Sequence, residues 1–252
     1  MDTFKIAFEL RPLADVEPWG TRESGLRLSW FGLTDGWYDV VIAGQHLFRG
    51  EGGDPRGVDY QVVRLWEDLI DVIPGAIDEI PDALATRVAD VDRWNEWVAR
   101  AWELENADEQ LETALPWWSD RRVDTSHLRG APHLFLWRQG QEVHVRWRSR
   151  PQPGEPRWSS PRGNATLALA AFIDELVRFD QAFIEAITKR VESIARGWSR
   201  PEIAIDVDEL RREHEDRATW LARALRLKRP TTYSWDAVVN AVTKLEERVG
   251  RA

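Results

Sequence analysis

Fifteen tryptophans in a chain of 252 residues constrain the fold more than any other feature. Each indole buries roughly 150–250 Å² and carries an N–H group that needs a hydrogen-bond partner. The rings gather in three places, which are Trp30 with Trp37, the segment 94–102, and Trp137 with Trp147 and Trp158. The chain is therefore expected to fold around aromatic packing. Because the third group lies beside arginines, it also has the composition of a protein interface.

Composition narrows the class of protein. Hydrophobic residues make up 43% and charged residues 31%, which is the balance of a globular chain. The absence of cysteine excludes disulfides, thiolate metal sites and cysteine redox chemistry. No stretch approaches 18 apolar residues, and the residues MDTFKIAFELRP are not expected to form a signal peptide. We therefore expect a cytoplasmic protein with no membrane span.

The formal net charge of −9 is unevenly distributed. Seventeen acids and six bases lie between Asp59 and Thr125, whereas seven arginines and two glutamates lie between Arg129 and Arg162. The acidic part is able to steer a basic partner, although charges of this kind are also usual on the solvated faces of helices.

Alternating apolar residues predict strands in the first third of the chain. The alternation is clean over Phe4–Leu10 and again over Leu26–Trp30. The pair Asp35-Gly36 follows, and it separates two apolar runs in the manner of a type I′ hairpin turn. A further turn is expected at Gly44-Gln45.

The next section is predicted to be helical. Apolar residues at helical spacing begin at Val63, and Pro74-Gly75 is expected to end that helix. Pro81 favours the start of a short helix, and Asp90 or Asp92 is a suitable cap for the next one.

A second hairpin is predicted over Leu134–Arg148, with its turn at Gln139-Gly140. Alternation places one set of side chains toward the core, namely Leu134, Leu136, Val143, Val145 and Trp147. The opposite face carries His133, Phe135, Trp137, His144, Arg146 and Arg148.

A long helix is predicted over residues 164–196 because apolar residues recur there at steps of three and four. The repeating residues are Phe172, Leu176, Phe179, Phe183, Ile187, Val191 and Ile194. A helical pair follows over 208–227 and 235–249, with Ser234 as the cap of its second member.

These patterns predict an α+β protein in which an antiparallel sheet, made from both hairpin regions, packs on the long helix. Residues 1–200 are expected to form the α+β domain, and residues 201–252 a helical lobe packed on the same domain. The first domain divides into a β meander (1–50), acidic helices (58–118), the second hairpin (133–149) and the long helix (164–196).

Three segments carry a resemblance to a known family. They are LSWFGLTDGWY (28–38), LFR (47–49) and YQVVRLWED (60–68). Together they resemble a family of uncharacterised bacterial proteins of unknown function, in which a W-F-G-L-T-D-G-W-Y hairpin leads into a strand. The resemblance covers about the first 80 residues well, and the second hairpin with its helix loosely. It implies a shared architecture and carries over no functional residues.

Two candidate sites follow from the residues. The possible interaction surface comprises Phe135, Trp137, His144, Arg146, Arg148 and Trp158. It can serve a protein partner or form an internal joint against the acidic helices. Nucleic acid is an unlikely partner, because the pI is 5.2 and dedicated binders are basic. The alternative is a ligand site around the first hairpin, formed by Asp35, Arg49, Arg64, Glu67 and Asp68.

Motifs for catalysis are missing. The glycine-rich segment 50–57 lacks the GK[ST] ending of a phosphate loop, and no GxSxG occurs. The five histidines are scattered and show no metal-binding spacing. We therefore assign no catalytic, metal or cofactor residues. The leading hypothesis is a non-enzymatic interaction protein, in its sharpest form an immunity or inhibitor protein against a basic effector. The alternative is a small-ligand enzyme or sensor that uses the first hairpin and the Glu67/Asp68 helix.

Overall fold

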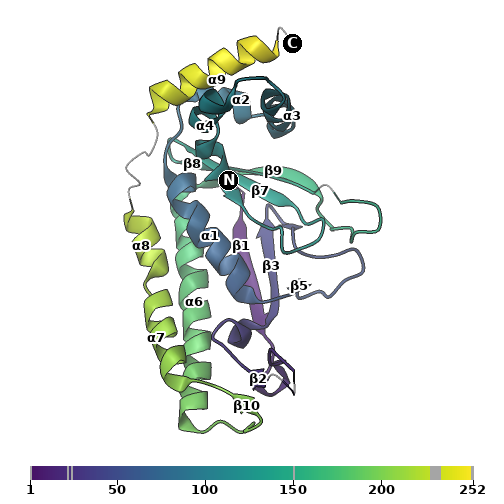
Figure 1. Ribbon diagram of the computed structural model, residues 1–252, viewed down its shortest axis with the longest axis vertical. Helices are drawn as coiled ribbons and strands as arrows, with labels where there is room; N and C mark the ends of the chain where they lie inside the picture. Colours follow the sequence, from purple (N-terminus) through teal and green to yellow (C-terminus); the bar gives the residue numbers. More distant parts are fainter. Residues whose placement is uncertain (1, 22, 24, 150, 228–233, 251–252) are drawn as a thin grey trace.

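The computed structural model describes the chain except residues 1, 22, 24, 150, 228–233 and 251–252 (Figure 1). Its strands are β1 (Phe4–Leu10), β2 (Leu26–Arg27), β3 (Gly36–Ile42), β4 (Gln45–His46), β5 (Val58–Asp59), β6 (Arg122–Val123), β7 (His133–Gln139), β8 (Glu142–Arg148), β9 (Arg162–Ala168) and β10 (Ile203–Ala204). Its α-helices are α1 (Val62–Ile77), α2 (Asp82–Val88), α3 (Val91–Trp102), α4 (Asp108–Ala114), α5 (Pro116–Ser119), α6 (Leu169–Arg196), α7 (Val207–Arg217), α8 (Trp220–Arg226) and α9 (Trp235–Val249). Short 3-10 helices lie at Leu13–Asp15 and Gly32–Thr34. The α+β class with antiparallel sheets is confirmed.

The first sheet is built around β3, which pairs with β1, β4 and β5. Its antiparallel register with β1 runs from Phe4 opposite Ile42 to Leu10 opposite Gly36. The turn between β3 and β4 is formed by Ala43 and Gly44, both at positive φ, one residue before the predicted position.

The predicted hairpin at Asp35-Gly36 is wrong. Asp35 has a φ of −56° and ends the 3-10 helix Gly32–Thr34, so no type I′ turn forms there. Gly36 instead begins β3, where a Cβ atom would overlap the carbonyl oxygen of Glu9 on β1. Glycine is therefore required for the close approach of two strands. The upstream strand β2 pairs in parallel with β10, far along the chain.

The second sheet has the order β6-β7-β8-β9. The predicted hairpin is present, and Gln139 pairs with Glu142 across a turn of Gly140 and Gln141. The following strand β9 corrects the predicted start of the long helix, because residues 164–168 belong to this strand. The expectation of one sheet from both hairpin regions is also wrong, since the two regions form separate sheets.

Helix α1 continues through Pro74 and Gly75, which were expected to end it. Gly75 is needed inside the helix, because a Cβ atom there would overlap the backbone carbonyl of Asp120. Helix α6 begins at Leu169, and its predicted stripe is confirmed: Phe172, Leu176, Phe179, Phe183, Ile187, Val191 and Ile194 are all buried.

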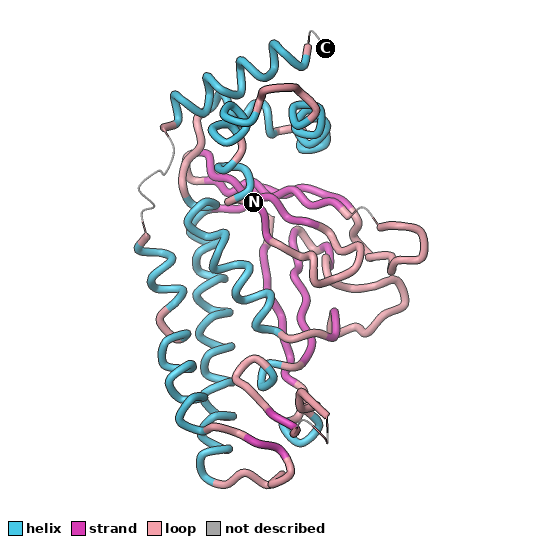
Figure 2. Tube along the Cα trace, in the orientation of Figure 1, coloured by secondary structure: helices cyan, strands magenta, loops and turns pink. Residues whose placement is uncertain are grey.

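Two hydrophobic clusters lie on opposite faces of the second sheet. The larger one contains the first sheet, α1, α6, α7 and α8, with Trp30, Trp66 and Phe183 in mutual ring contact. The smaller one contains α2–α5 and α9. Figure 2 shows this second helical group beyond the N-terminal end of α6. The two C-terminal helical segments therefore pack in different clusters. Among the described residues, no helix combines the length and apolar character needed to cross a membrane.

Candidate functional site

The aromatic part of the predicted interaction surface lies inside the molecule. Phe135 stacks on Trp118 with ring centroids 4.6 Å apart and an interplanar angle of 7°. Trp137 is only 1% exposed and belongs to the same small cluster as α2–α5. Both side chains join the second sheet to the acidic helices, which leaves neither ring available to a partner.

Charge complementarity supports this internal joint. Arg148 pairs with Asp92 at the start of α3, and Arg121 lies 3.4 Å from Asp78. Arg138 lies 4.0 Å from Glu79. Arg138 and Arg148 of the second sheet, with Arg121 directly before β6, thus lie against acids of α3 and of the α1–α2 connection.

The other three residues of the predicted surface occupy different positions. Trp158 is buried in the larger cluster, where its indole N–H donates to the carbonyl of Arg129 at 3.2 Å. The half-buried His144 ring stacks on Trp137, with centroids 5.4 Å apart, and burial lowers the pKa of this histidine. Arg146 is also half-buried and lies with its guanidinium 5.7 Å from the Trp137 ring.

The five residues of the alternative ligand site do not converge. Asp35 pairs with Arg11 at 2.8 Å. Arg49 pairs at 2.8 Å with Asp39, a buried carboxylate of β3. Glu67 lies between Arg64, its neighbour on α1, and Arg217 of α7. Asp35, Arg49 and Glu67 therefore stabilise three separate junctions, and Arg64 lies beside Glu67.

Asp68, the fifth member, takes part in a buried polar chain that sequence analysis did not find. Its Oδ2 lies 3.7 Å from Nδ1 of His127, whose Nε2 lies 2.8 Å from the hydroxyl of Tyr38. Burial, reinforced by the negative charge of Asp124, raises the pKa of Asp68 to about 7. Burial and the charge of Arg64 lower the pKa of His127 to about 4. The His127–Tyr38 contact is a hydrogen bond, whereas the 3.7 Å between Asp68 and His127 exceeds hydrogen-bond distance, so the three groups do not form a continuous proton relay.

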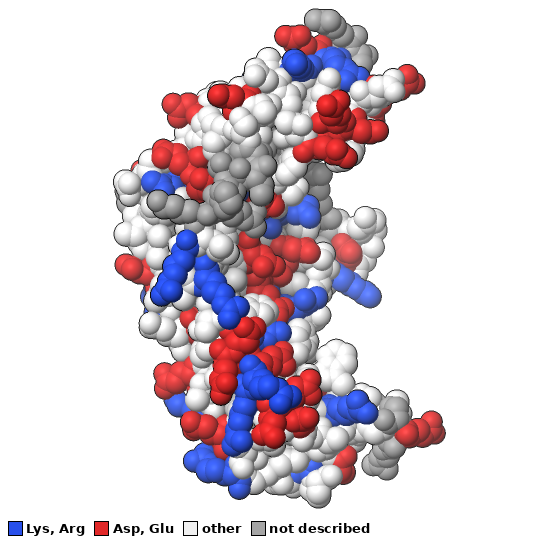
Figure 3. Space-filling model, turned by 60° about the vertical axis from the view of Figure 1, so that its left-hand side comes forward, with Lys and Arg blue, Asp and Glu red and all other residues white. Residues whose placement is uncertain are grey.

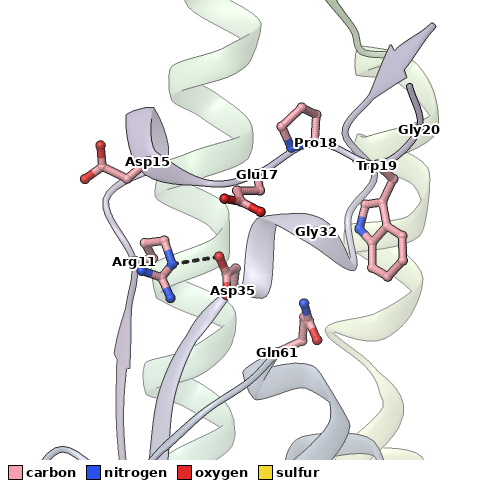
Figure 4. Close-up of a pocket in the computed structure, with 9 residues that line it drawn as sticks. All are labelled: Arg11, Asp15, Glu17, Pro18, Trp19, Gly20, Gly32, Asp35 and Gln61. Carbon is pink, nitrogen blue, oxygen red and sulfur yellow. Dashed lines mark hydrogen bonds and ion pairs between the residues drawn. The ribbon is translucent and has the colours of Figure 1, made fainter. Parts of the chain in front are cut away.

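One predicted residue, Asp35, lines a pocket of about 530 Å³ beside β1 and the 3-10 helix Gly32–Thr34. Figure 4 shows Glu17 and Gln61 pointing into this pocket, the Trp19 ring at one side, and Asp15 pointing away. The Trp19 ring is 57% exposed. The pocket thus contains the Arg11–Asp35 ion pair, the carboxylate of Glu17 and an accessible aromatic ring, and Glu17 with the Trp19 ring suits a cationic group.

A second exposed tryptophan lies at the end of α3. Trp102 is 60% exposed, although Trp94 on the same helix is buried. Exposed carboxylates occupy α2, α3, α4 and the segment after α3, and these are Asp82, Asp90, Glu96, Glu103, Glu105, Asp108, Glu109 and Glu112. Figure 3 shows acidic side chains over this end of the molecule, and further acidic side chains interspersed with basic ones along the rest of the visible face. We call α2–α4 with Trp102 and these carboxylates the acidic helical surface. The sequence signal for it was the excess of acids between Asp59 and Thr125, whereas the exposure of Trp102 came only from the structure.

Comparison with known proteins identifies the family. Neither the curated proteins nor the solved structures compared with the chain gave a match. The model of a family of unknown function, DUF5984, matches residues 5–241, which is nearly the whole chain. This agrees with the expected resemblance to an uncharacterised family. The chain is a member of the DUF5984 family.

Proposed function

We propose that this protein is an interaction module that binds a basic protein partner on its acidic helical surface, in the manner of an immunity or inhibitor protein. The observation that carries the proposal is the exposed Trp102 within a surface that holds the excess negative charge of the chain.

The charge on this surface is concentrated. Three acids of residues 78–120, namely Asp78, Glu79 and Asp92, pair with arginines outside this range. Residues 78–120 nevertheless contain twelve acids and three arginines, an excess of nine that equals the net charge of the whole chain. The rest of the sequence is therefore balanced. A field confined to one end of a molecule steers a basic partner to that end and raises the association rate.

Trp102 supplies the short-range part of the interaction. Tryptophan is the residue type most enriched among those that dominate binding energy at interfaces. Its ring also attracts arginine and lysine side chains through its negative face. The neighbouring Glu103 and Glu105 are exposed and able to pair with the same cations.

The test is a pull-down from the native host with the full chain, followed by measured binding of the purified partner. We expect a basic partner whose affinity falls with salt, and we expect Trp102→Ala to weaken it by at least about 2 kcal/mol, the effect of losing a dominant interface residue. Trp19→Ala is the matched control, since it removes the other strongly exposed indole. An acidic partner, or one bound equally well by Trp102→Ala, would contradict the proposal.

A second candidate, a sensor for a small cationic ligand, is favoured by the pocket that contains Trp19, Glu17 and Asp35. The same two variants separate the candidates. A quaternary ammonium or guanidinium compound that binds the wild type and Trp102→Ala, but not Trp19→Ala, would support the second function.

A further inference from the structure

A pocket of about 390 Å³ lies between the α2–α3 connection and the β8–β9 strand pair. Its charged and polar lining residues are Asp90, Asp92, Arg146, Arg148, Arg162 and Asn164. We call it the arginine pocket. It lies on the face of the second sheet that carries Phe135 and Trp137, at the edge of the joint between this sheet and the acidic helices.

The strand register explains why arginines collect there. In the register of β8 with β9, Arg146 lies opposite Asn164 and Arg148 lies opposite Arg162. Because side chains opposite each other on paired strands share a face, all four point to the same side of the sheet. Like charges directly opposite each other destabilise a sheet, so this arrangement calls for a compensating negative charge.

The protein supplies only part of that charge. Asp92 pairs with Arg148. The carboxylate of Asp90 accepts the backbone N–H of Arg93 at 3.1 Å and caps α3. Within the described part of the chain, Arg146 and Arg162 form no ion pair with a carboxylate.

Arg146 shows the consequence of this imbalance most clearly. Its guanidinium is half-buried, and burial without a carboxylate lowers its pKa. The contact with the Trp137 ring offsets part of the desolvation cost. A guanidinium placed at the wall of a pocket in this way remains able to form charge-assisted hydrogen bonds with an anion.

We propose that the arginine pocket binds the phosphoryl group of a small phosphomonoester. Arg146 and Arg162 have no carboxylate partner among the described residues, so both guanidinium groups are able to donate to a dianion, and the planar donor arrangement of arginine fits phosphate oxygens in pairs. Asp90 and Asp92 in the wall disfavour more highly charged polyphosphates. The pocket volume favours a small molecule over an extended chain.

The experiment is calorimetric titration of the full chain with inorganic phosphate, glycerol phosphate and acetate at constant ionic strength and pH 8. We expect saturable binding of both phosphates and weaker binding of acetate. Arg162→Gln is expected to weaken phosphate binding by about tenfold or more, the effect of losing a charge-assisted hydrogen bond. Arg162 is exposed, so the variant is expected to fold normally.

Arg157→Gln is the control, because it removes an equal charge from an exposed arginine outside the pocket. Its phosphate affinity should stay within about twofold of the wild type, since long-range surface charges are screened. Arg146→Gln should behave like Arg162→Gln if its melting temperature shows that it is folded. No saturable phosphate binding, equal binding of acetate, or equal losses in Arg157→Gln and Arg162→Gln would overturn the proposal. Because Trp102→Ala leaves this pocket intact, the proposed partner binding and the phosphate site fail independently.

Discussion

At the scale of single residues, the most unusual electrostatic feature is the pair Asp68 and His127. Both side chains are mostly buried, and burial favours the neutral form of each. Between about pH 4 and 6.5 the folded state holds a proton on Asp68 and none on His127. The unfolded chain in that range holds a proton on the histidine and none on the aspartate. The total number of bound protons is therefore the same, and the pair adds little pH dependence to stability.

Single substitutions of Asp68 and His127 should reveal two opposite pH dependences of the free energy of unfolding. Unfolding releases the Asp68 proton between about pH 4 and 7, so this residue makes stability fall as pH rises. Unfolding takes up a proton at His127 between about pH 4 and 6.5, so this residue makes stability rise with pH. Relative to the wild type, Asp68→Asn should gain stability with rising pH and His127→Gln should lose it, each by on the order of 3 kcal/mol. Urea unfolding at several pH values measures both. If the stability of both variants relative to the wild type changed with pH in the same direction, the opposite pKa shifts of Asp68 and His127 would be contradicted.

Residue identity alone predicted some sites and missed others. Burial of Trp30 and Trp37 follows from their apolar neighbours, and both are buried. Gly36 was misinterpreted because glycine serves both positive φ and close backbone approach, and the second role depends on a strand distant in sequence. Likewise, the approach of His127 to Asp68 is a tertiary contact that leaves no local pattern.

At the scale of elements, helical periodicity was the most reliable signal. The stripe on α6 was predicted in full because a long helix repeats its pattern many times. Strand β9 was missed for the opposite reason. Its sequence RGNATLA is short and contains glycine and alanine, and it leads directly into α6. Its Gly163 is accounted for only by the packing of the Trp147 ring, which a Cβ atom would overlap.

The α6 stripe supports a prediction with an internal control. Phe179 is 2% exposed and lies in the larger cluster. Phe179→Asp would bury an unpaired charge, so we expect a loss above about 4 kcal/mol and no soluble protein. Gln181 is exposed on the other side of the same helix, and Gln181→Asp should change stability by less than about 0.5 kcal/mol. Soluble yield and thermal melting compare the two. Equal tolerance would show that this face of α6 does not cover the sheet.

At the scale of the whole molecule, the second sheet links the two hydrophobic clusters. One face of the β7–β8 hairpin supplies Leu136 and Trp147 to the larger cluster, and the other supplies Phe135 and Trp137 to the smaller one. Helix α9 is tied to the smaller cluster by Arg87 of α2, which donates to both carboxylate oxygens of Glu246 at 2.9 and 2.8 Å. This two-sided role was not predictable from alternation alone, since alternation separates the faces of a hairpin without showing what covers each.

A shared sheet should make the two clusters unfold together. Because residues of the β7–β8 hairpin belong to both clusters, we expect calorimetry of the wild type to show one transition with equal calorimetric and van't Hoff enthalpies. Trp137→Ala removes a ring from the smaller cluster and should cost about 3–5 kcal/mol. Because the clusters are coupled, the variant should melt in a single transition shifted downward by roughly 10 °C. Trp147→Ala, on the opposite face of the same hairpin, should shift that transition in the same direction. If Trp137→Ala instead melted in two steps, with the second at the wild-type temperature, the smaller cluster would be an independent unit. The acidic helical surface would then be carried on a lobe able to open without disturbing the rest of the protein.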